Sequence, residues 1–361
     1  MSPFEHMVRG ETRIVGGRYH LMHVAGRGGM AVVWRGEVLG ARGFTRPVAV
    51  KQMHQHLFEK PIYVKMFVEE ARIGAALQHP NIARVYDFVE QEGELFLICE
   101  WIEGISLSNY INFMFSHGLR TRWDLVAAIG IGMLYGLGAA HERIAPDGRP
   151  APVVHRDVSP HNILLDERGV IKLIDFGLCL AWDRTQHLTE PGVVKGKMAY
   201  LSPEIVQGQR PSPLSDQFAV GSILWEALVG RKLFDGPTDF DIYCKLRDGH
   251  IEPLRPSRPD LPSRLIQVIN KALSMDPAHR FSGAREMARE LALVLKHTKA
   301  PKDLHALLAK SVARARSYDA VSEVTDISDE TPVIEFERES AVPREGRAGR
   351  LWHRLRSLGG F

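Results

Sequence analysis

The chain has 361 residues, 45% hydrophobic and 25% charged, the composition of an ordinary soluble globular protein. Lys and Arg total 46 and Asp and Glu total 43, a net charge of +3, so charge alone indicates neither a nucleic-acid nor a membrane partner. The cysteines Cys99, Cys179 and Cys244 form no CxxC pair, which argues against disulfides and against a structural zinc site. Because the N-terminus is polar and carries no secretion signal, we expect a cytoplasmic location.

The first hundred residues are rich in predicted strands. Residues 1–17 are polar and are expected to be loosely ordered. One helix is predicted over 63–77, where apolar residues recur at helical spacing until "HPN" ends the pattern. Short apolar or alternating segments predict strands at 31–39, 47–53, 83–90 and 95–102.

After Gly104 the pattern becomes helical, so we expect an α+β protein with a small β-rich lobe joined near 100–104 to a larger helical lobe. The apolar run 125–140 is shorter than the roughly 18 residues of a membrane span, and we interpret it as a buried core helix rather than a transmembrane segment. Helices are predicted over 107–118, 121–142, 215–230, 238–248, 261–274 and 284–296.

From His297 the regular pattern weakens. Residues 319–339 hold eight acidic residues and residues 341–361 hold five arginines, and such charge blocks predict a flexible, solvated tail over 297–361. The stretch 349–358 has the composition of a basic amphipathic helix for a membrane surface or a partner. An inert tail and an autoinhibitory or docking segment are the alternatives.

The small lobe carries two signs of phosphate binding. In "AGRGGMAVVW", Gly26 and Gly28 permit a tight turn whose backbone can approach a phosphate closely. A strand follows this turn, which argues against the dinucleotide fingerprint and the Walker loop, because both continue into a helix. Lys51 ends the strand-like "VAVK", where its ammonium group needs anions or water. Glu70, on the apolar side of the following helix, is its predicted partner.

The large lobe contains three side chains whose oxygens could bind a metal ion or a hydroxyl group. Asp157 and Asn162 lie five residues apart in "HRDVSPHN", and Asp175 follows the strand-like "VIKLI". Phosphoryl transfer from ATP needs Mg²⁺ held by oxygen ligands and an acceptor hydroxyl held in line. Together these residues favour a phosphotransferase.

In this order the motifs resemble the eukaryotic-like (Hanks-type) Ser/Thr protein kinase family found in bacteria. The resemblance covers about residues 18–296 and rests on "GRGGMAVV", "VAVK", "FVEEA", "LQHPNI", "HRDVSPHN", "DFG", "GKMAYLSPE", "DQFAVG" and "DPAHRF". It implies a bilobal kinase fold with an N-lobe at 18–103 and a C-lobe at 104–296. It also implies transfer of the γ-phosphoryl group of ATP to Ser or Thr of protein substrates, with Mg²⁺, or Mn²⁺ as an alternative.

The resemblance further implies individual roles. Asp157 orients the acceptor hydroxyl and takes its proton, and Asn162 and Asp175 bind Mg²⁺. Asp216 braces the catalytic loop. Glu204 forms a structural ion pair with Arg280. Around the nucleotide the implied residues are Gly26, Arg27 and Gly28 over the phosphates, Lys51 with Glu70 on the α- and β-phosphates, Val33 and Ala49 against adenine, Cys99 as gatekeeper, and Glu100 and Ile102 in the hinge.

Arg156, directly before Asp157, is typical of kinases that are switched by phosphorylation of the activation loop, because the Arg needs an anion. Thr185 and Thr189 are the candidate sites, and we expect autophosphorylation of at least one. The alternative is an activation loop that is ordered without phosphate.

The sequence departs from the family at paired positions. Ser159 stands where a Lys usually contacts the γ-phosphate, and Lys197 stands where a Thr is usual. Our hypothesis is a swap, in which Lys197 restores the cation and Ser159 the hydroxyl. Without a cation, transition-state stabilisation should fall by about 3–4 kcal/mol, by analogy with a lost oxyanion donor. The alternative is that Lys197 faces solvent and the enzyme is slow.

Gly74 stands where the family usually has an apolar side chain that stacks with Phe176 and His155. It predicts a gap and a loosely held helix, steadied by a homodimer or an activating partner, so that Gly74→Leu should raise activity.

Cys179 is either a redox-sensitive thiol or a buried small residue. His54 and His56 form either a solvated pair or part of a metal site.

Two other functional classes stay open. A pseudokinase or signalling scaffold is favoured only by Ser159. A small-molecule phosphotransferase shares the ATP site, but "SPE" and Arg280 argue for a protein-substrate platform. The expected partners are therefore protein substrates and not nucleic acid.

Overall fold

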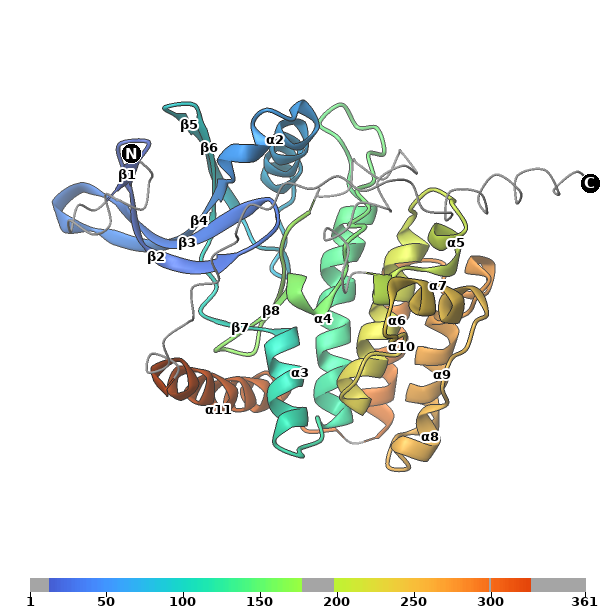
Figure 1. Cartoon of the computed structure of the whole chain (residues 1–361). Helices are drawn as coiled ribbons and strands as arrows, with labels where there is room; N and C mark the ends of the chain where they lie inside the picture. Colours follow the sequence, from blue (N-terminus) through green and yellow to red (C-terminus); the bar gives the residue numbers. More distant parts are fainter. Residues whose placement is uncertain (1–12, 177–197, 299, 326–361) are drawn as a thin grey trace, which may run out of the picture. The chain divides into compact units, whose positions relative to one another are not determined.

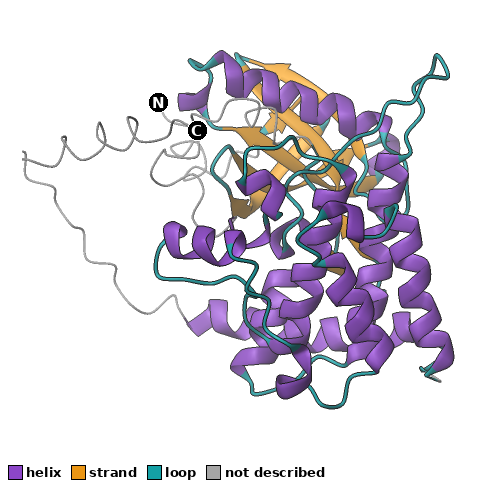
Figure 2. Ribbon diagram, turned by 90° about the vertical axis from the view of Figure 1, so that its right-hand side faces the viewer, coloured by secondary structure: helices purple, strands orange, loops and turns teal. Residues whose placement is uncertain are grey.

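The computed structural model describes residues 13–176, 198–298 and 300–325 (Figure 1). Contacts group residues 1–319 into one compact unit and 320–361 into a second. Within the first unit a β-rich lobe is followed by a helical lobe, which confirms the predicted bilobal α+β fold (Figures 1 and 2).

The β-rich lobe is built on one antiparallel six-stranded sheet with the order β1-β2-β3-β4-β6-β5. Alternation along β4 buries Val48 and Val50 completely in one hydrophobic cluster and places Ala49 and Lys51 on the opposite face. The strands are β1 (Ile14–Val15), β2 (Tyr19–Arg27), β3 (Ala31–Leu39), β4 (Thr45–Met53), β5 (Val85–Gln91) and β6 (Glu94–Glu100).

Helix α2 (Pro61–Ala76) packs on this sheet through a second cluster that includes Phe67 and Ala71. It begins with a proline at its first position, where the missing N–H has no intrahelical acceptor, and it ends before "HPN" as predicted. Its buried side also carries Glu70, which is only 4% exposed.

A three-stranded sheet lies where the two lobes meet, with the order β7-β8-β9. The loop with Asp157 and Asn162 leads into β8, and Asp175 follows β9, so this sheet brings both loops to one place. Its strands are β7 (Gly104–Ser106), β8 (Ile163–Asp166) and β9 (Ile171–Leu173).

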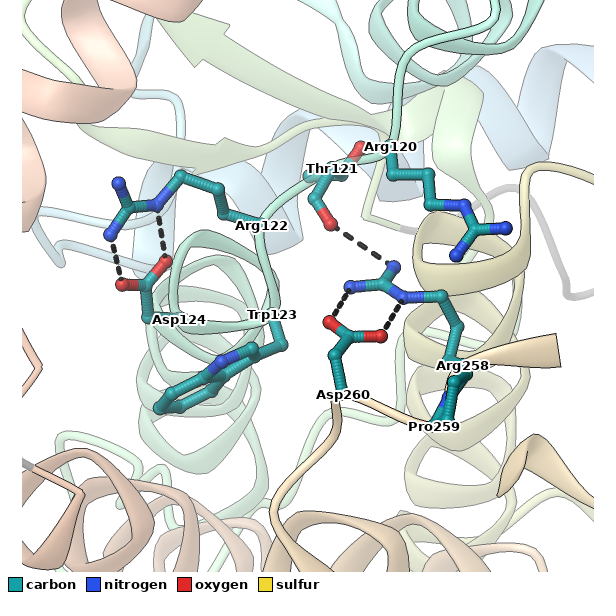
Figure 3. Close-up of a pocket in the computed structure, with 8 residues that line it drawn as sticks. All are labelled: Arg120, Thr121, Arg122, Trp123, Asp124, Arg258, Pro259 and Asp260. Carbon is teal, nitrogen blue, oxygen red and sulfur yellow. Dashed lines mark hydrogen bonds and ion pairs between the residues drawn. The ribbon is translucent and has the colours of Figure 1, made fainter. Parts of the chain in front are cut away.

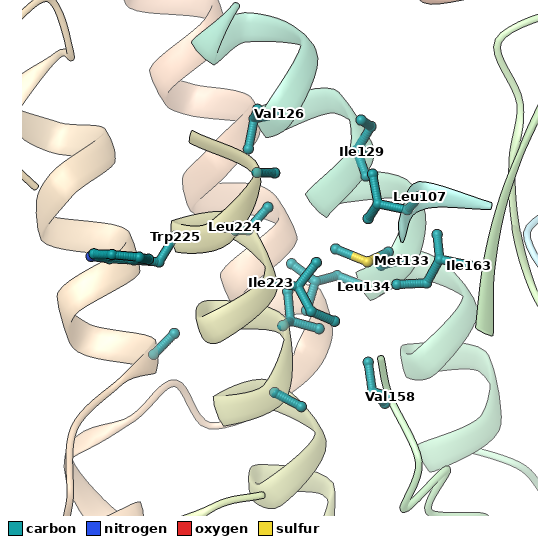
Figure 4. Close-up of a cluster of buried hydrophobic side chains, with 14 of the residues drawn as sticks. Leu107, Val126, Ile129, Met133, Leu134, Val158, Ile163, Ile223, Leu224 and Trp225 are labelled. Carbon is teal, nitrogen blue, oxygen red and sulfur yellow. The ribbon is translucent and has the colours of Figure 1, made fainter. Parts of the chain in front are cut away.

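The helical lobe is centred on α4, which packs against α6 and α10 around fully buried side chains such as Met133 and Leu134 (Figure 4). In the described part of the chain α4 is the one helix long and apolar enough to cross a membrane, and most of it is buried in this core. Gly136 permits close packing, because a Cβ there would lie 2.7 Å from Leu173 Cδ1. The helices are α3 (Leu107–Ser116), α4 (Trp123–His141), α5 (Pro203–Val206), α6 (Pro213–Val229), α7 (Asp239–Arg247), α8 (Leu254–Ser257), α9 (Ser263–Ala272) and α10 (Ala284–His297).

A further helix, α11 (Leu304–Thr325), corrects the prediction of a flexible tail from residue 297. Leu308, Val312 and Ala315 are at most 1% exposed and belong to the main core. These residues have helical spacing, but the charge blocks that follow dominate the composition of the tail and concealed the pattern.

Candidate active site

Lys51 and Glu70 form the predicted ion pair, with Nζ 2.7 Å from Glu70 Oε1. The neighbouring acid, Glu69, is instead paired with Arg72 on the outside of the helix. The choice of Glu70 from its apolar surroundings is therefore confirmed. The pair joins β4 to α2 and holds the helix against the sheet.

Asp175 is the second anion on Lys51, with Oδ1 3.0 Å from Nζ. Burial alone would lower the pKa of Lys51, but the two carboxylates raise it above its ordinary value. Burial likewise would raise the pKa of Asp175, yet Lys51 lowers it below its ordinary value. Burial raises the pKa of Glu70 to about 7, against the opposing charge of Lys51. One cation thus serves two acids, Glu70, which is buried, and Asp175, whose side chain is 28% exposed, and the excess negative charge suits a site for cations.

Protonation of Glu70 should couple pH to the stability of the nucleotide-free protein. Because its folded-state pKa of about 7 lies above the ordinary value of 4.5, the folded protein binds this proton more readily than the unfolded chain. The stabilisation is therefore complete below about pH 4.5 and is lost as pH rises through about 7. In urea unfolding at pH 5.5 and 8, the wild type should lose stability relative to Glu70→Gln as pH rises. Parallel pH dependences would contradict this assignment.

The catalytic loop is braced by Asp216 of α6, as predicted. Its two carboxylate oxygens accept hydrogen bonds from the backbone N–H groups of His155 (2.8 Å) and Arg156 (3.0 Å). His141 Nε2 lies 2.8 Å from the same carboxylate. This support allows Arg156 to hold a φ of 68°, a conformation that costs a non-glycine residue about 1–3 kcal/mol.

Asn162 ties the catalytic loop together. Its Nδ2 donates to the backbone oxygen and to Oδ2 of Asp157, both at 2.9 Å. Its backbone oxygen accepts from the N–H of Ile174, next to Asp175. Asp175 itself has a φ of 61°. Two loops that are separate in sequence thus present Asp157, Asn162 and Asp175 together.

The predicted gap at Gly74 is wrong, because Val85 of β5 occupies the space. A Cβ built on Gly74 would lie 2.4 Å from Val85 Cγ2. The ring stack below is present, with the centroids of His155 and Phe176 4.5 Å apart. The valine therefore fills the space beside Gly74, where a gap was predicted.

Gly74→Ala should destabilise the protein, opposite in sign to the usual effect. Alanine normally stabilises a helix by about 1 kcal/mol relative to glycine. Here the added methyl meets a stiff β-branched side chain, and overpacking costs about 1–3 kcal/mol. Urea unfolding of Gly74→Ala should show the loss, whereas the same change in a Val85→Ala background should stabilise. Stabilisation in both backgrounds would show that the Val85 side chain moves aside without an energetic cost. The larger Gly74→Leu should lower activity.

The residues predicted around adenine are gathered by strand pairing. Val33 faces Lys51 across β3 and β4, and Ala49 faces Cys99 across β4 and β6. Burial raises the pKa of Cys99 to about 12, so its thiol stays protonated.

In the predicted hinge, the Glu100 carboxylate binds Lys172 Nζ at 2.8 and 2.9 Å, and the Glu100 backbone N–H donates to the Arg84 oxygen. Ile102 is half-buried. Glu100 thus has a side-chain partner that the sequence did not reveal.

The glycine-rich turn is contacted by a histidine, His54, in a way that the sequence did not reveal. His54 Nε2 lies 2.8 Å from the backbone oxygen of Gly28, and the rings of His54 and His56 stack at 5.3 Å. Gly26 is paired with Val33, and Arg27 ends β2 beside it. Within the described residues no group of three or more His, Cys, Asp or Glu side chains could hold a metal.

Four predicted positions lie outside the described residues: Cys179, Thr185, Thr189 and Lys197. Ser159 is described and is 4% exposed, with its backbone oxygen accepting from the Asn162 N–H. The exchange between Ser159 and Lys197 therefore stays a hypothesis.

The predicted ion pair between Glu204 and Arg280 is present and bidentate, with both N–O distances 2.7 Å. The two side chains are 5% and 0% exposed. Arg280 also donates to the backbone oxygens of Leu214 and Ser274. It fastens α5, which follows the activation segment, to the helical core.

A cavity of about 390 Å³ lies away from these residues, beside the N-terminal end of α4 (Figure 3). Four of its charged groups form two ion pairs. Arg258 is bidentate to Asp260, with both distances 2.9 Å, and Arg122 is bidentate to Asp124. We interpret this cavity as a structural junction and not as part of the catalytic centre.

Comparison with known proteins agrees with this geometry. Residues 19–292 match the protein kinase domain family. The tyrosine-protein kinase MasK of Myxococcus xanthus is 36% identical over 279 residues, and the serine/threonine-protein kinase PrkC of Bacillus subtilis is 33% identical over 285. Each match covers 77% of this chain but only 43% and 40% of those relatives, so the chain spans less than half their length.

Among solved structures, the PknI kinase domain of Mycobacterium tuberculosis is similar, with a TM-score of 0.58 at 25% identity. The match covers 78% of this chain and 98% of that one. The ion pair, the braced catalytic loop and the sequence matches all lead to the same conclusion: this chain belongs to the protein kinase family.

Proposed function

We propose that this kinase transfers the γ-phosphoryl group of ATP to Ser or Thr side chains of proteins in the cytoplasm. The observation that carries the proposal is the single cluster formed by Lys51, Glu70 and Asp175 beside the Asp157–Asn162 pair. A scaffold that had lost catalysis would have no need to keep a buried cation shared by two acids. All three charged groups of the cluster are retained, which counts against the pseudokinase alternative.

Each side chain then has one task. Lys51, steadied by Glu70, binds the α- and β-phosphates, and the backbone of the turn at Gly26, Arg27 and Gly28 covers them. Asp157 accepts a hydrogen bond from the acceptor hydroxyl, aligns its oxygen with the γ-phosphorus and takes its proton.

The donor set at Asn162 and Asp175 fits Mg²⁺. Because the amide nitrogen of Asn162 is directed at Asp157, its amide oxygen is the atom turned toward a cation. Asp175 adds a carboxylate that stays ionised, and hard oxygen ligands are those that Mg²⁺ prefers. When bound, the ion neutralises phosphate charge. Mn²⁺ accepts the same oxygen ligands.

The specificity for Ser and Thr is the finer part of the proposal. PrkC and the other Ser/Thr kinase relatives support it, and so does Pro160 after Ser159. The relative MasK is named a tyrosine kinase, and Ser159 departs from the usual lysine, which keeps tyrosine as the second candidate. Phosphoamino-acid analysis of labelled substrate distinguishes them directly.

We also propose activation by autophosphorylation at Thr185 or Thr189. Support comes from Arg156, whose backbone is fixed by Asp216 in a left-handed conformation beside the catalytic Asp. A cation in this place gives a phosphorylated loop a partner. Thr185→Ala and Thr189→Ala, alone and combined, should lower activity, and a fully active double variant would favour a loop ordered without phosphate.

The deciding experiment incubates purified protein with γ-labelled ATP, Mg²⁺ and a generic basic protein, beside Lys51→Met. Label transferred by the wild type but not by the variant supports the kinase proposal. Nucleotide binding with no transfer would favour a scaffold, or an enzyme that waits for a dimer or another activating partner. Mass spectrometry of the same samples locates the phosphorylated residues.

A further inference from the structure

Helix α11 lies beside α3, close to the segment that joins the two lobes (Figure 1). Apart from the buried face at Leu308 and Val312, polar contacts hold it in one orientation. Tyr110 Oη of α3 lies 2.7 Å from Ser311 Oγ, and His305 Nδ1 lies 3.0 Å from the backbone oxygen of Gly169. The helix is thus docked at both its start and its middle.

Gly169, in the turn between β8 and β9, shows how close this docking is. A Cβ on Gly169 would lie 2.2 Å from the backbone oxygen of His305. Gly169 also has a φ of 79°, which disfavours any other residue. The turn is therefore shaped to receive the beginning of α11.

One turn beyond Ser311, α11 supplies a cation to two acids. Arg316 pairs with Glu103, directly after the predicted hinge, and lies 2.8 Å from Glu167 of the turn after β8. These two glutamates adjoin each other, because the N–H of Glu167 donates to the backbone oxygen of Glu103 at 2.9 Å. Two neighbouring carboxylates repel, and Arg316 relieves that repulsion.

From Glu103 the contacts continue into the β-rich lobe. Trp101 Nε1 donates to the second oxygen of Glu103 at 2.9 Å, so the carboxylate is held from both sides. The guanidinium of Arg35, on β3, lies 5.8 Å from the centroid of the Trp101 ring. A chain of contacts therefore runs from α11 through the hinge to the strand that carries Val33.

We propose that α11 positions the hinge for nucleotide binding and that Arg316 is the positioning residue. By fixing Glu103 and, through it, Trp101, Arg316 holds the backbone at 100–102 in the arrangement that receives adenine. Loss of this contact lets the hinge move, so that binding must order it again. The inference rests on the proposed ATP site.

The test measures the Kd of MgADP and the steady-state constants of the full chain. Arg316→Gln should raise the Kd of MgADP and the KM for ATP about fivefold or more, with kcat at saturating ATP unchanged. Arg314→Gln is the matched control, because Arg314 is exposed on the same helix. Glu167→Gln should also leave Kd unchanged, since Glu103 keeps its partner.

A double-mutant cycle separates positioning from general destabilisation. Glu103→Gln should weaken nucleotide binding as much as Arg316→Gln does, and the double variant should be no weaker, because one contact carries both effects. If docking of α11 favours nucleotide binding, nucleotide binding must favour docking of α11 by the same free energy. MgADP should therefore slow hydrogen exchange of the α11 amides in the wild type and not in Glu103→Gln. Additive losses would overturn the proposal.

Two further outcomes are decisive. If the wild type binds MgADP and Arg316→Gln binds it equally well, α11 does not position the hinge, although the ATP site stands. If the wild type binds no nucleotide, the proposed ATP site fails and this inference fails with it. Should Arg316→Gln not fold, Glu103→Gln decides alone, because it leaves the buried face of α11 intact.

Discussion

Replacing Asp157 by asparagine should lower kcat by about 10²–10⁴-fold, the usual contribution of a general base. The change removes the group that, in the proposed mechanism, takes the proton of the acceptor hydroxyl. It keeps the shape of the loop, because the amide oxygen of asparagine can still accept from Asn162 Nδ2, as Asp157 Oδ2 does at 2.9 Å. Nucleotide affinity should therefore be retained.

Asp157→Ala separates the two tasks of this residue. It removes the proton acceptor and also the side-chain oxygen that orients Asn162, so affinity for Mg²⁺ should fall together with kcat. Stopped-flow phosphoryl transfer and a Mg²⁺ titration measure the two effects. Asp147→Asn is the control, since that carboxylate is exposed and pairs with Arg149 two residues away. If Asp157→Asn kept the activity of the control, another group would have to take the proton.

The arrangement of the site residues was predictable because each motif is local. Asp157 and Asn162 share one loop, and Asp175 follows a short apolar strand, so residue type and spacing were sufficient. The partner of Lys51 was predictable from one further signal, the apolar neighbours of Glu70. The predicted helix over 284–296 likewise differs from α10 by a single residue at its end.

The contacts that the sequence could not reveal join residues far apart in the chain. Val85 fills the space beside Gly74 only because β5 and α2 pack together. His54 reaches Gly28 across a strand pair. Nothing local to Gly74 or His54 encodes these distances, so the sequence predicts a gap at the glycine and leaves the histidine as either a solvated group or a metal ligand.

Helix α11 was missed for a different reason. Its apolar residues, Leu304, Leu308 and Val312, do follow helical spacing, but the stripe is narrow and an acidic block follows it. Its partner surface includes Gly169 and Glu103, which lie more than a hundred residues earlier. A narrow stripe of this kind becomes a helix in the fold only where such a surface receives it.

Arg280→Met should destabilise the protein by about 3–5 kcal/mol, because it leaves the Glu204 carboxylate buried without a cation. Glu204 is only 5% exposed at its side chain, so water cannot replace the guanidinium. The backbone oxygens of Leu214 and Ser274 also lose their donor. Urea unfolding monitored by tryptophan fluorescence measures the loss.

The exposed pair Arg285–Glu142 is the matched control, with side chains 53% and 55% exposed. Arg285→Met should cost only about 0–1 kcal/mol, since water screens the pair and solvates the remaining carboxylate. Adding Glu204→Leu to Arg280→Met should recover part of the loss, because it removes the stranded charge but not the unpaired backbone oxygens. If Arg280→Met cost no more than Arg285→Met, the buried pair would not be what fastens α5 to the core. If the double variant regained the full stability of the wild type, the backbone oxygens of Leu214 and Ser274 would have found other donors. The loss in Arg280→Met would then come entirely from the buried charge of Glu204.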